Sequence, residues 1–188
     1  MKTIYRILIS IYILTLIFIA LTSFHYNIFI SLCLLIPLYF IHHDLYRIEY
    51  LIYIYLTQVL GTTCQFYHLP YYDKIMHFLS GMIFVIIGYV YLQKYISFQK
   101  ILYIMINCVE MSLAFLWEVF EYSGLIFFNY DASHHYTTGV HDTMQDMIVS
   151  LLGGLIITYL IYKYPSGIEN LYKLPPDNPD EVSQQSHI

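Results

Sequence analysis

The feature that most constrains the fold of this chain is a series of six apolar segments, each close to the length of a membrane-spanning helix. A helix needs roughly 20 mostly apolar residues to cross the hydrocarbon core of a bilayer. The segments are residues 4–23, 26–41, 48–67, 74–93, 101–128 and 142–162. The second segment is the shortest and contains Pro37, which a membrane helix tolerates when neighbouring groups satisfy the freed carbonyl. The sequence therefore predicts an all-α fold, a polytopic membrane bundle of about six transmembrane helices.

Composition places the chain among integral membrane proteins. Only 11% of its 188 residues are charged and 59% are hydrophobic, whereas a soluble domain carries about 25% charged residues. The net charge of −5 and the lack of a basic patch exclude nucleic acid as an expected partner. Cys33, Cys64 and Cys108 lie singly in apolar segments, so we expect neither a disulfide framework nor a cysteine metal motif. The expected partner is the lipid bilayer, and the expected location is the cell membrane, as a multi-pass protein.

The basic residues predict how the chain is oriented in the membrane. Loops rich in lysine and arginine stay on the cytoplasmic side. With six spans, one side of the membrane receives Lys2, Arg6, Arg47, Lys94, Lys100, Lys163 and Lys173. The other side receives only Lys74. Both termini are therefore expected in the cytoplasm.

Two regions are predicted, a six-helix transmembrane domain over residues 1–163 and a disordered cytoplasmic tail over residues 164–188. The tail contains PPDNPDEVSQQSHI, which is polar, acidic and rich in proline, and cannot bury enough apolar surface to become ordered. At the other end, Lys2, Arg6 and the apolar run 7–21 also fit a signal peptide. The following TSFH is a poor cleavage site, so we expect the first helix to be retained.

Two glutamates, Glu118 and Glu121, lie one turn apart inside the fifth apolar segment, in the stretch WEVFEY. An ionisable residue at the bilayer centre costs about 2.5–3.5 kcal/mol even on mild insertion scales. Such residues face the interior of a helix bundle and find partners there. The two glutamates therefore predict a polar site between helices.

Polar residues at helical spacing supply the predicted partners. Residues three or four apart share one face of a helix, and three such stripes occur: Asp73, His77 and Gly81; Asn107, Glu110, Ala114, Glu118 and Glu121; Asp142, Asp146, Ser150 and Gly153. At 1.5 Å per residue, the two glutamates, His77 and Asp146 fall at one level in the outer half of the membrane. Gly81, Gly153 and Gly154 allow close helix approach. We treat Glu110 and Asn107, which lie deeper, as polar packing.

The negative charges of this predicted pocket can be balanced in three ways. Lys74 and a protonated His77 balance some of the acids, one or two acids are protonated, or a divalent metal ion is bound. Glu118, Glu121, Asp146 and His77 form the predicted metal-ligand set and are also the candidate catalytic acid–base residues. Asp73, Lys74 and Asp142 are expected beside them, with Lys74 meeting an anionic headgroup. Asp142 is equally well explained as a helix cap.

Three spaced motifs resemble a known family. YDKxxHFxSG, WExxEY and TGVxDTMxDxIVxxLGG occur in this order within residues 48–162. The combination resembles a family of bacterial membrane-spanning proteins of unknown function that includes YjdF-type proteins. A looser likeness reaches the VanZ-like family, associated with teicoplanin resistance, and rests on Asp73, Lys74, His77, Phe78, Asp146 and Gly153. Ser150, His141 and Gln145 depart from that second pattern. The resemblance implies a membrane topology and a recurring polar constellation, and no established activity.

Two functions fit these predictions. The first is an enzyme, with or without a metal ion, that acts at the outer face on a lipid or cell-envelope precursor; a bound metal would activate a water molecule. The second is a small proton- or cation-coupled transporter, in which the acids form a relay. A structural or accessory role is the remaining alternative. A polar path to the cytoplasm favours transport, whereas a closed inner end favours an enzyme or a binding protein. No GxSxG, HExxH or P-loop motif is present.

Overall fold

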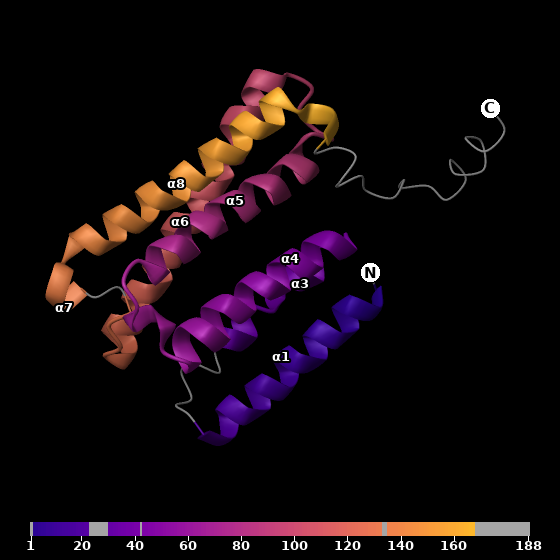
Figure 1. Ribbon diagram of the computed structural model, residues 1–188. Helices are drawn as coiled ribbons and strands as arrows, with labels where there is room; N and C mark the ends of the chain where they lie inside the picture. The colour runs from indigo at the N-terminus through magenta and orange to yellow at the C-terminus, as the bar shows by residue number, and fades with distance from the viewer. Residues whose placement is uncertain (1, 23–29, 42, 133–134, 168–188) are drawn as a thin grey trace.

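The computed structural model describes residues 2–22, 30–41, 43–132 and 135–167. Within these ranges the chain is helical and forms no strand (Figure 1), which confirms the predicted all-α membrane bundle. The elements in chain order are α1 (Lys2–Thr22), α3 (Ile36–Phe40), α4 (Asp44–Ile54), η1 (Tyr55–Thr63), η2 (Phe66–His68), α5 (Tyr72–Leu92), α6 (Gln99–Phe128), α7 (His135–Thr138) and α8 (Val140–Lys163).

Three helices, α5, α6 and α8, are long and apolar enough to cross a membrane. They begin and end within two residues of the fourth, fifth and sixth predicted segments. The apolar helices Thr3–Phe18 and Ile30–Tyr39 are shorter. A total of six spans, the position of the termini and the division at residue 163 remain predictions. Most of the expected disordered tail, residues 168–188, lies outside the described residues.

The second predicted segment is interrupted at Pro37. Helical residues 30–33 are followed by a turn at residues 34 and 35 before α3 begins. Proline has no backbone N–H to donate, and its ring collides with the carbonyl four residues earlier, here that of Cys33. The described part of this segment is therefore two short helical pieces.

The third predicted segment changes its winding partway. Tyr55–Thr63 continues α4 as a π-helix, a form that is rare in proteins and often occurs at functional sites. The hydroxyl groups of Thr62 and Thr63 donate to the carbonyl oxygens of Thr57 and Gln58, five residues earlier. The segment then ends in the short η2 turn, which brings Tyr67 against Gly61.

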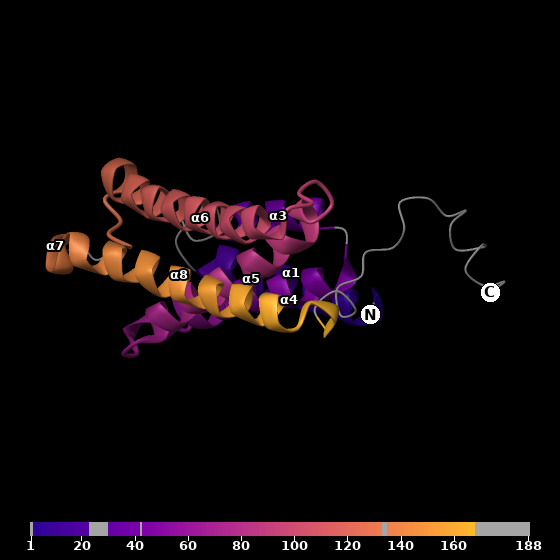
Figure 2. The same ribbon diagram turned by 90° about the horizontal axis from the view of Figure 1, so that it is seen from above.

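The helices α5, α6 and α8 pack against one another and carry the candidate site (Figures 1 and 2). The tightest approach joins α5 to α8, where a Cβ atom on Gly81 would overlap the carbonyl oxygen of Ser150. A Cβ atom on Gly153 would likewise overlap the carbonyl oxygen of Phe78. The two backbones are therefore in direct contact, as the glycines predicted.

The part of the apolar core that α5, α6 and α8 contribute lies mainly toward the end of this bundle where α5 and α8 end and α6 begins, and the rest of the core lies on α1, α4 and their neighbouring segments. Core members at that end are fully or nearly fully buried and include Tyr89, Val90, Leu102, Ile106, Ile157 and Ile161. The opposite end, which we call the polar end, is formed by the first turns of α5 and α8 and the last turns of α6. In the six-span topology, the polar end faces outward.

Candidate functional site

Three helix termini position the polar side chains. Tyr71 has a φ of 64°, which ends the preceding loop abruptly and starts α5 at Tyr72. Asp73 then falls in the first turn of α5 and Asp142 in the first turn of α8. Carboxylates are favourable at these positions because the N-terminal end of a helix carries partial positive charge. The polar end therefore concentrates acids at the junction of α5 and α8.

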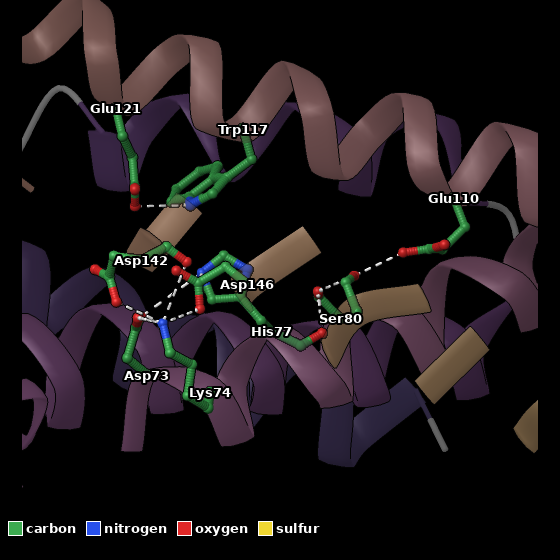
Figure 3. A network of polar contacts seen from close by, with 10 residues as sticks. Asp73, Lys74, His77, Ser80, Glu110, Trp117, Glu121, Asp142 and Asp146 are labelled. Atoms are coloured by element: carbon green, nitrogen blue, oxygen red, sulfur yellow. Dashed lines mark hydrogen bonds and ion pairs between the residues drawn. The ribbon is translucent and has the colours of Figure 1, made fainter. Parts of the chain in front are cut away.

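Lys74 lies at the centre of these acids. Its Nζ is 2.6 Å from Oδ1 of Asp142 and 2.6 Å from Oδ1 of Asp146, and 3.7 Å from Oδ2 of Asp73. Charge-assisted bonds of this length are among the strongest in proteins. We call Asp73, Lys74, His77, Asp142 and Asp146 the carboxylate–lysine cluster (Figure 3). Nζ of Lys74 donates to one carboxylate oxygen each of Asp142 and Asp146, and its expected contact with an anionic headgroup stays a prediction.

His77 completes the cluster from the next turn of α5. Its Nε2 lies 3.6 Å from Oδ1 of Asp73 and 3.9 Å from Oδ1 of Asp146. Ligand atoms of these three residues all lie within 4.8 Å of one another. Two atoms that each lie about 2.1 Å from one tetrahedral ion are about 3.4 Å apart. The group Asp73–His77–Asp146 therefore has the chemistry and nearly the spacing of a partial metal site.

The cluster is not neutral as it stands. With His77 uncharged, the three aspartates outweigh the single ammonium of Lys74 when all three are ionised. Buried charges require partners or they change protonation state. A divalent cation would balance the excess, and so would two protons. Because Oδ1 of Asp146 already accepts a hydrogen bond from Lys74, an ion at that oxygen would compete with the ammonium.

Glu118 stands near this cluster without a hydrogen bond. Both of its carboxylate oxygens are buried and find no partner among the described residues, and the residue is 6% exposed. The hydroxyl of Thr143 on α8 acts on this carboxylate electrostatically but does not meet hydrogen-bond geometry. An unpartnered buried carboxylate is costly, which makes Glu118 a further candidate proton or cation ligand.

Glu121 is engaged elsewhere. Its Oε1 accepts a hydrogen bond of 2.8 Å from Nε1 of Trp117 one turn earlier, and Figure 3 shows this pair on α6, apart from the carboxylate–lysine cluster. Of the predicted ligands Glu118, Glu121, Asp146 and His77, the last two share a group of possible metal ligands with Asp73, which was expected only beside the metal. Asp73 reaches them because α5 begins at Tyr72 and places it beside the first turns of α8. The predicted ligand set itself stays a prediction.

A chain of hydroxyl groups extends from the cluster into the bundle. Ser80 donates to the carbonyl oxygen of His77 at 2.7 Å and lies 3.4 Å from Oγ of Ser150. Ser150 donates to Oε1 of Glu110 at 2.6 Å (Figure 3). Sequence reasoning gave Glu110 no partner and overlooked Ser80, although Ser80 lies one turn from His77. The spacing of Ser150 to Asp146 was the available signal.

Three cavities meet at the polar end, and both Asp73 and Tyr67 line all of them. The side cavity, of about 370 Å³, adjoins Lys74, Asp142 and Gln145. The polar cavity, of about 360 Å³, is bounded by residues that include Gln58, Gln65, Trp117, Glu121 and Asp131. The apolar cavity, of about 250 Å³, reaches His77, Ser80 and Glu121 and is lined mainly by Leu34, Pro37, Met76, Phe84, Leu113, Ala114 and Leu116.

Tyr67 is a site residue that the sequence did not single out. It lies in the η2 turn, outside the long helices, and its ring packs edge-on against Tyr72. Its phenol hydroxyl is both a donor and an acceptor of hydrogen bonds. Tyr67 can therefore act as a hydrogen-bond donor where the three cavities meet.

Comparison with known proteins gives one match. The family described as "Predicted membrane protein (DUF2238)" matches residues 4–167. No curated protein and no solved structure matches the chain. The match covers most of the chain and contains every residue of the carboxylate–lysine cluster. It confirms the resemblance to a membrane-protein family of unknown function, whereas the likeness to the VanZ-like family stays a prediction.

Proposed function

We propose, from the premise that this chain belongs to the DUF2238 family of predicted membrane proteins, that it is a multi-pass enzyme of the cell membrane. Its substrate is an amphiphilic lipid or cell-envelope precursor. The substrate chain occupies the apolar cavity, and its polar end meets Asp73, His77 and Glu121 at the mouth of the polar cavity.

One observation carries this proposal. Asp73, His77 and Glu121 line the apolar cavity, and each of them also belongs to the carboxylate–lysine cluster or to the polar cavity beside it. A ligand site of this kind, mostly apolar with a few convergent polar groups, is the usual form of a small-molecule site. An apolar cavity within a membrane bundle that ends at ionisable groups suits a molecule with a hydrocarbon chain and a reactive polar end.

The closed inner end supports an enzyme over a transporter. Tyr89, Val90, Leu102, Ile106 and Ile161 pack together beyond the polar residues and are at most 5% exposed. All three cavities lie on the polar side of this core. Among the described residues, this apolar core therefore lies between the three cavities and the opposite end of the bundle.

The lining of the polar cavity indicates the class of headgroup. Among its described lining residues, Asp73, Glu121 and Asp131 are acidic, and none is lysine or arginine. Gln58, Gln65 and the ring of Trp117 add amide and aromatic surfaces. Such a lining favours a headgroup rich in hydroxyl or amine groups.

The chemistry assigned to the site is hydrolysis or transfer at the polar end of the substrate. Asp73, His77 and Asp146 would hold a divalent cation, which supplies Lewis acidity and a nucleophilic water of lowered pKa. Lys74 balances Asp142 and Asp146 and orients both carboxylates. His77, Glu118 and Glu121 are the groups available to exchange a proton with the substrate.

A proton- or cation-coupled transporter is the second candidate. It is favoured by the hydrogen bond from Ser150 to Glu110 below the cluster and by the hydroxyl of Ser80, which lies 3.4 Å from that of Ser150. These groups extend polar contacts toward the middle of the bundle, as a relay requires.

Native mass spectrometry of the protein released from mild detergent tests the proposed function. We expect wild-type protein to retain one amphiphile, and Ala114→Phe, which fills the apolar cavity, to lose it. Ser112→Phe adds the same ring to the exposed face of the same helix and serves as the matched control. The retained amphiphile, incubated with fresh protein and divalent cations, should be converted by the wild type and not by Asp73→Asn. Equal retention in all three proteins would contradict the assignment of the cavity.

A further inference from the structure

Glu110 is the most deeply buried acid of the described chain. It lies in the middle of α6, is 0% exposed, and is separated from the carboxylate–lysine cluster by Ser150 and Ser80. None of the described residues forms an ion pair with it. Ser150 of α8 donates to its Oε1, and its Oε2 borders Gly154 of α8 together with Val85 of α5 and Asn107 of α6; none of these residues is charged. An isolated charge here would be costly in the apolar interior of a membrane bundle.

The amide of Asn107 has a fixed orientation. Its Nδ2 donates to the carbonyl oxygen of Tyr103 at 2.7 Å and to Oγ1 of Thr158 at 2.8 Å. A carbonyl oxygen only accepts hydrogen bonds, so the nitrogen must face Tyr103 and the alternative flip of the amide is excluded. Oδ1 therefore points the other way and is buried without a partner.

Oε2 of Glu110 is the second buried oxygen without a partner in this region. A Cβ atom built on Gly154 would lie 3.3 Å from Oδ1 of Asn107 and 3.4 Å from Oε2 of Glu110. Both oxygens therefore border the space beside Gly154, which has no side chain. Both are acceptors when Glu110 is ionised, so neither can satisfy the other.

One proton satisfies both atoms. We propose that Glu110 is a buried proton-binding site, in which the carboxyl carries its proton on Oε2 and donates it to Oδ1 of Asn107. Oε1 remains the acceptor for Ser150, so all three groups are paired. The proton removes the isolated charge and links Glu110 to Asn107 within α6. Separate hydrogen bonds, from Asn107 to Thr158 and from Ser150 to Glu110, connect α6 to α8. This site is independent of the proposed enzyme activity.

Infrared spectroscopy of the protein in lipid membranes tests the site. We expect the difference spectrum of wild type minus Glu110→Gln at neutral pH to show the C=O band of a protonated carboxylic acid. A difference spectrum with the paired bands of an ionised carboxylate would overturn the proposal. The same spectra are recorded with sodium and with a bulky organic cation. A carboxylate that appears only in sodium would make this a sodium site and would likewise overturn it.

Two variants test whether Glu110 carries the proton and whether this proton reaches Asn107. Glu110→Gln keeps the shape of the protonated acid and can donate to Oδ1 of Asn107, so we expect it to fold with wild-type thermal stability. Its failure to fold would count against a protonated Glu110. Asn107→Ala removes the acceptor, so the band should shift in frequency while Glu110 stays protonated. An unchanged band would show that the proton does not reach Asn107.

Discussion

At the scale of single residues, Lys74 determines whether the acids of the polar end can coexist. It is the only lysine or arginine of the described chain within ion-pair distance of Asp73, Asp142 and Asp146. Removing one partner of a buried charge pair costs about 3–5 kcal/mol, and partial exposure of Lys74 reduces this figure. We predict that Lys74→Met lowers the thermal unfolding temperature clearly. Lys74→Met combined with Asp146→Asn should recover part of the loss. A double variant no more stable than the single one would contradict the pairing.

The metal hypothesis also belongs to this scale. Asp73→Asn and Asp146→Asn each remove a ligand of the Asp73–His77–Asp146 group. We expect both to abolish a divalent metal that copurifies with wild type, measured by mass spectrometry of protein prepared without chelators or a histidine tag. Glu121→Gln is the matched control and should keep the metal, because Glu121 binds Trp117. Loss in the control as well would return Glu121 to the ligand set, and no metal in wild type would leave protons to balance the acids.

At the scale of helices, the contact between α5 and α8 depends on two glycines. A methyl group on Gly81 or Gly153 would meet the backbone of the facing helix, which cannot move away as a flexible side chain can. Overpacking of this kind costs about 1–3 kcal/mol or more. We predict that Gly81→Ala and Gly153→Ala reduce the thermal stability in detergent strongly. Gly88→Ala is the control, because its Cβ would lie 3.7 Å from the nearest side-chain atoms of Ile106. Equal stability of the three variants would exclude the close contact.

The same helices show which parts of the fold and of the candidate site could be predicted from the sequence. Spacing and hydropathy predicted α5, α6 and α8, and the polar stripes predicted that His77 and Asp146 would meet. Spacing could not tell that Asp73 rather than Glu121 would join them, because this depends on how each helix is rotated and where it begins. The pairing of Ser150 with Glu110 likewise follows from the depth of α6 against α8, which one sequence does not define. The π-helix at Tyr55–Thr63 left no pattern that hydropathy could reveal.

At the scale of the whole molecule, the orientation predicted by the basic residues has consequences for accessible thiols. Cys64 is exposed beside the polar end, and six spans place it outside the cell. We predict that a membrane-impermeant maleimide labels Cys64 in intact cells. A cysteine introduced at the exposed position Ser97, in a background without native cysteines, should react only after the membrane is permeabilised. The reverse labelling pattern would show that the protein has the opposite orientation in the membrane, with the carboxylate–lysine cluster at the cytoplasmic face.

The two ends of the molecule differ in the kinds of groups they contain. Apolar core residues pack where α5 and α8 finish, and the three cavities and the carboxylate–lysine cluster lie toward the other end. A bundle with one closed end and one polar, cavity-bearing end is suited to act on a molecule that is already in the membrane. We therefore assign the apolar cavity and the cluster to one site for an amphiphile.

A density map of the protein in lipid nanodiscs, with a bound antibody fragment to aid alignment, tests this claim most directly. We expect elongated density in the apolar cavity, between Leu34, Phe84 and Leu113. This density should end beside Asp73 and His77. Ala114→Phe should remove this density and leave the lipids at the outer surface in place. A wild-type map in which side chains fill the cavity, with lipid only around the perimeter, would contradict the account.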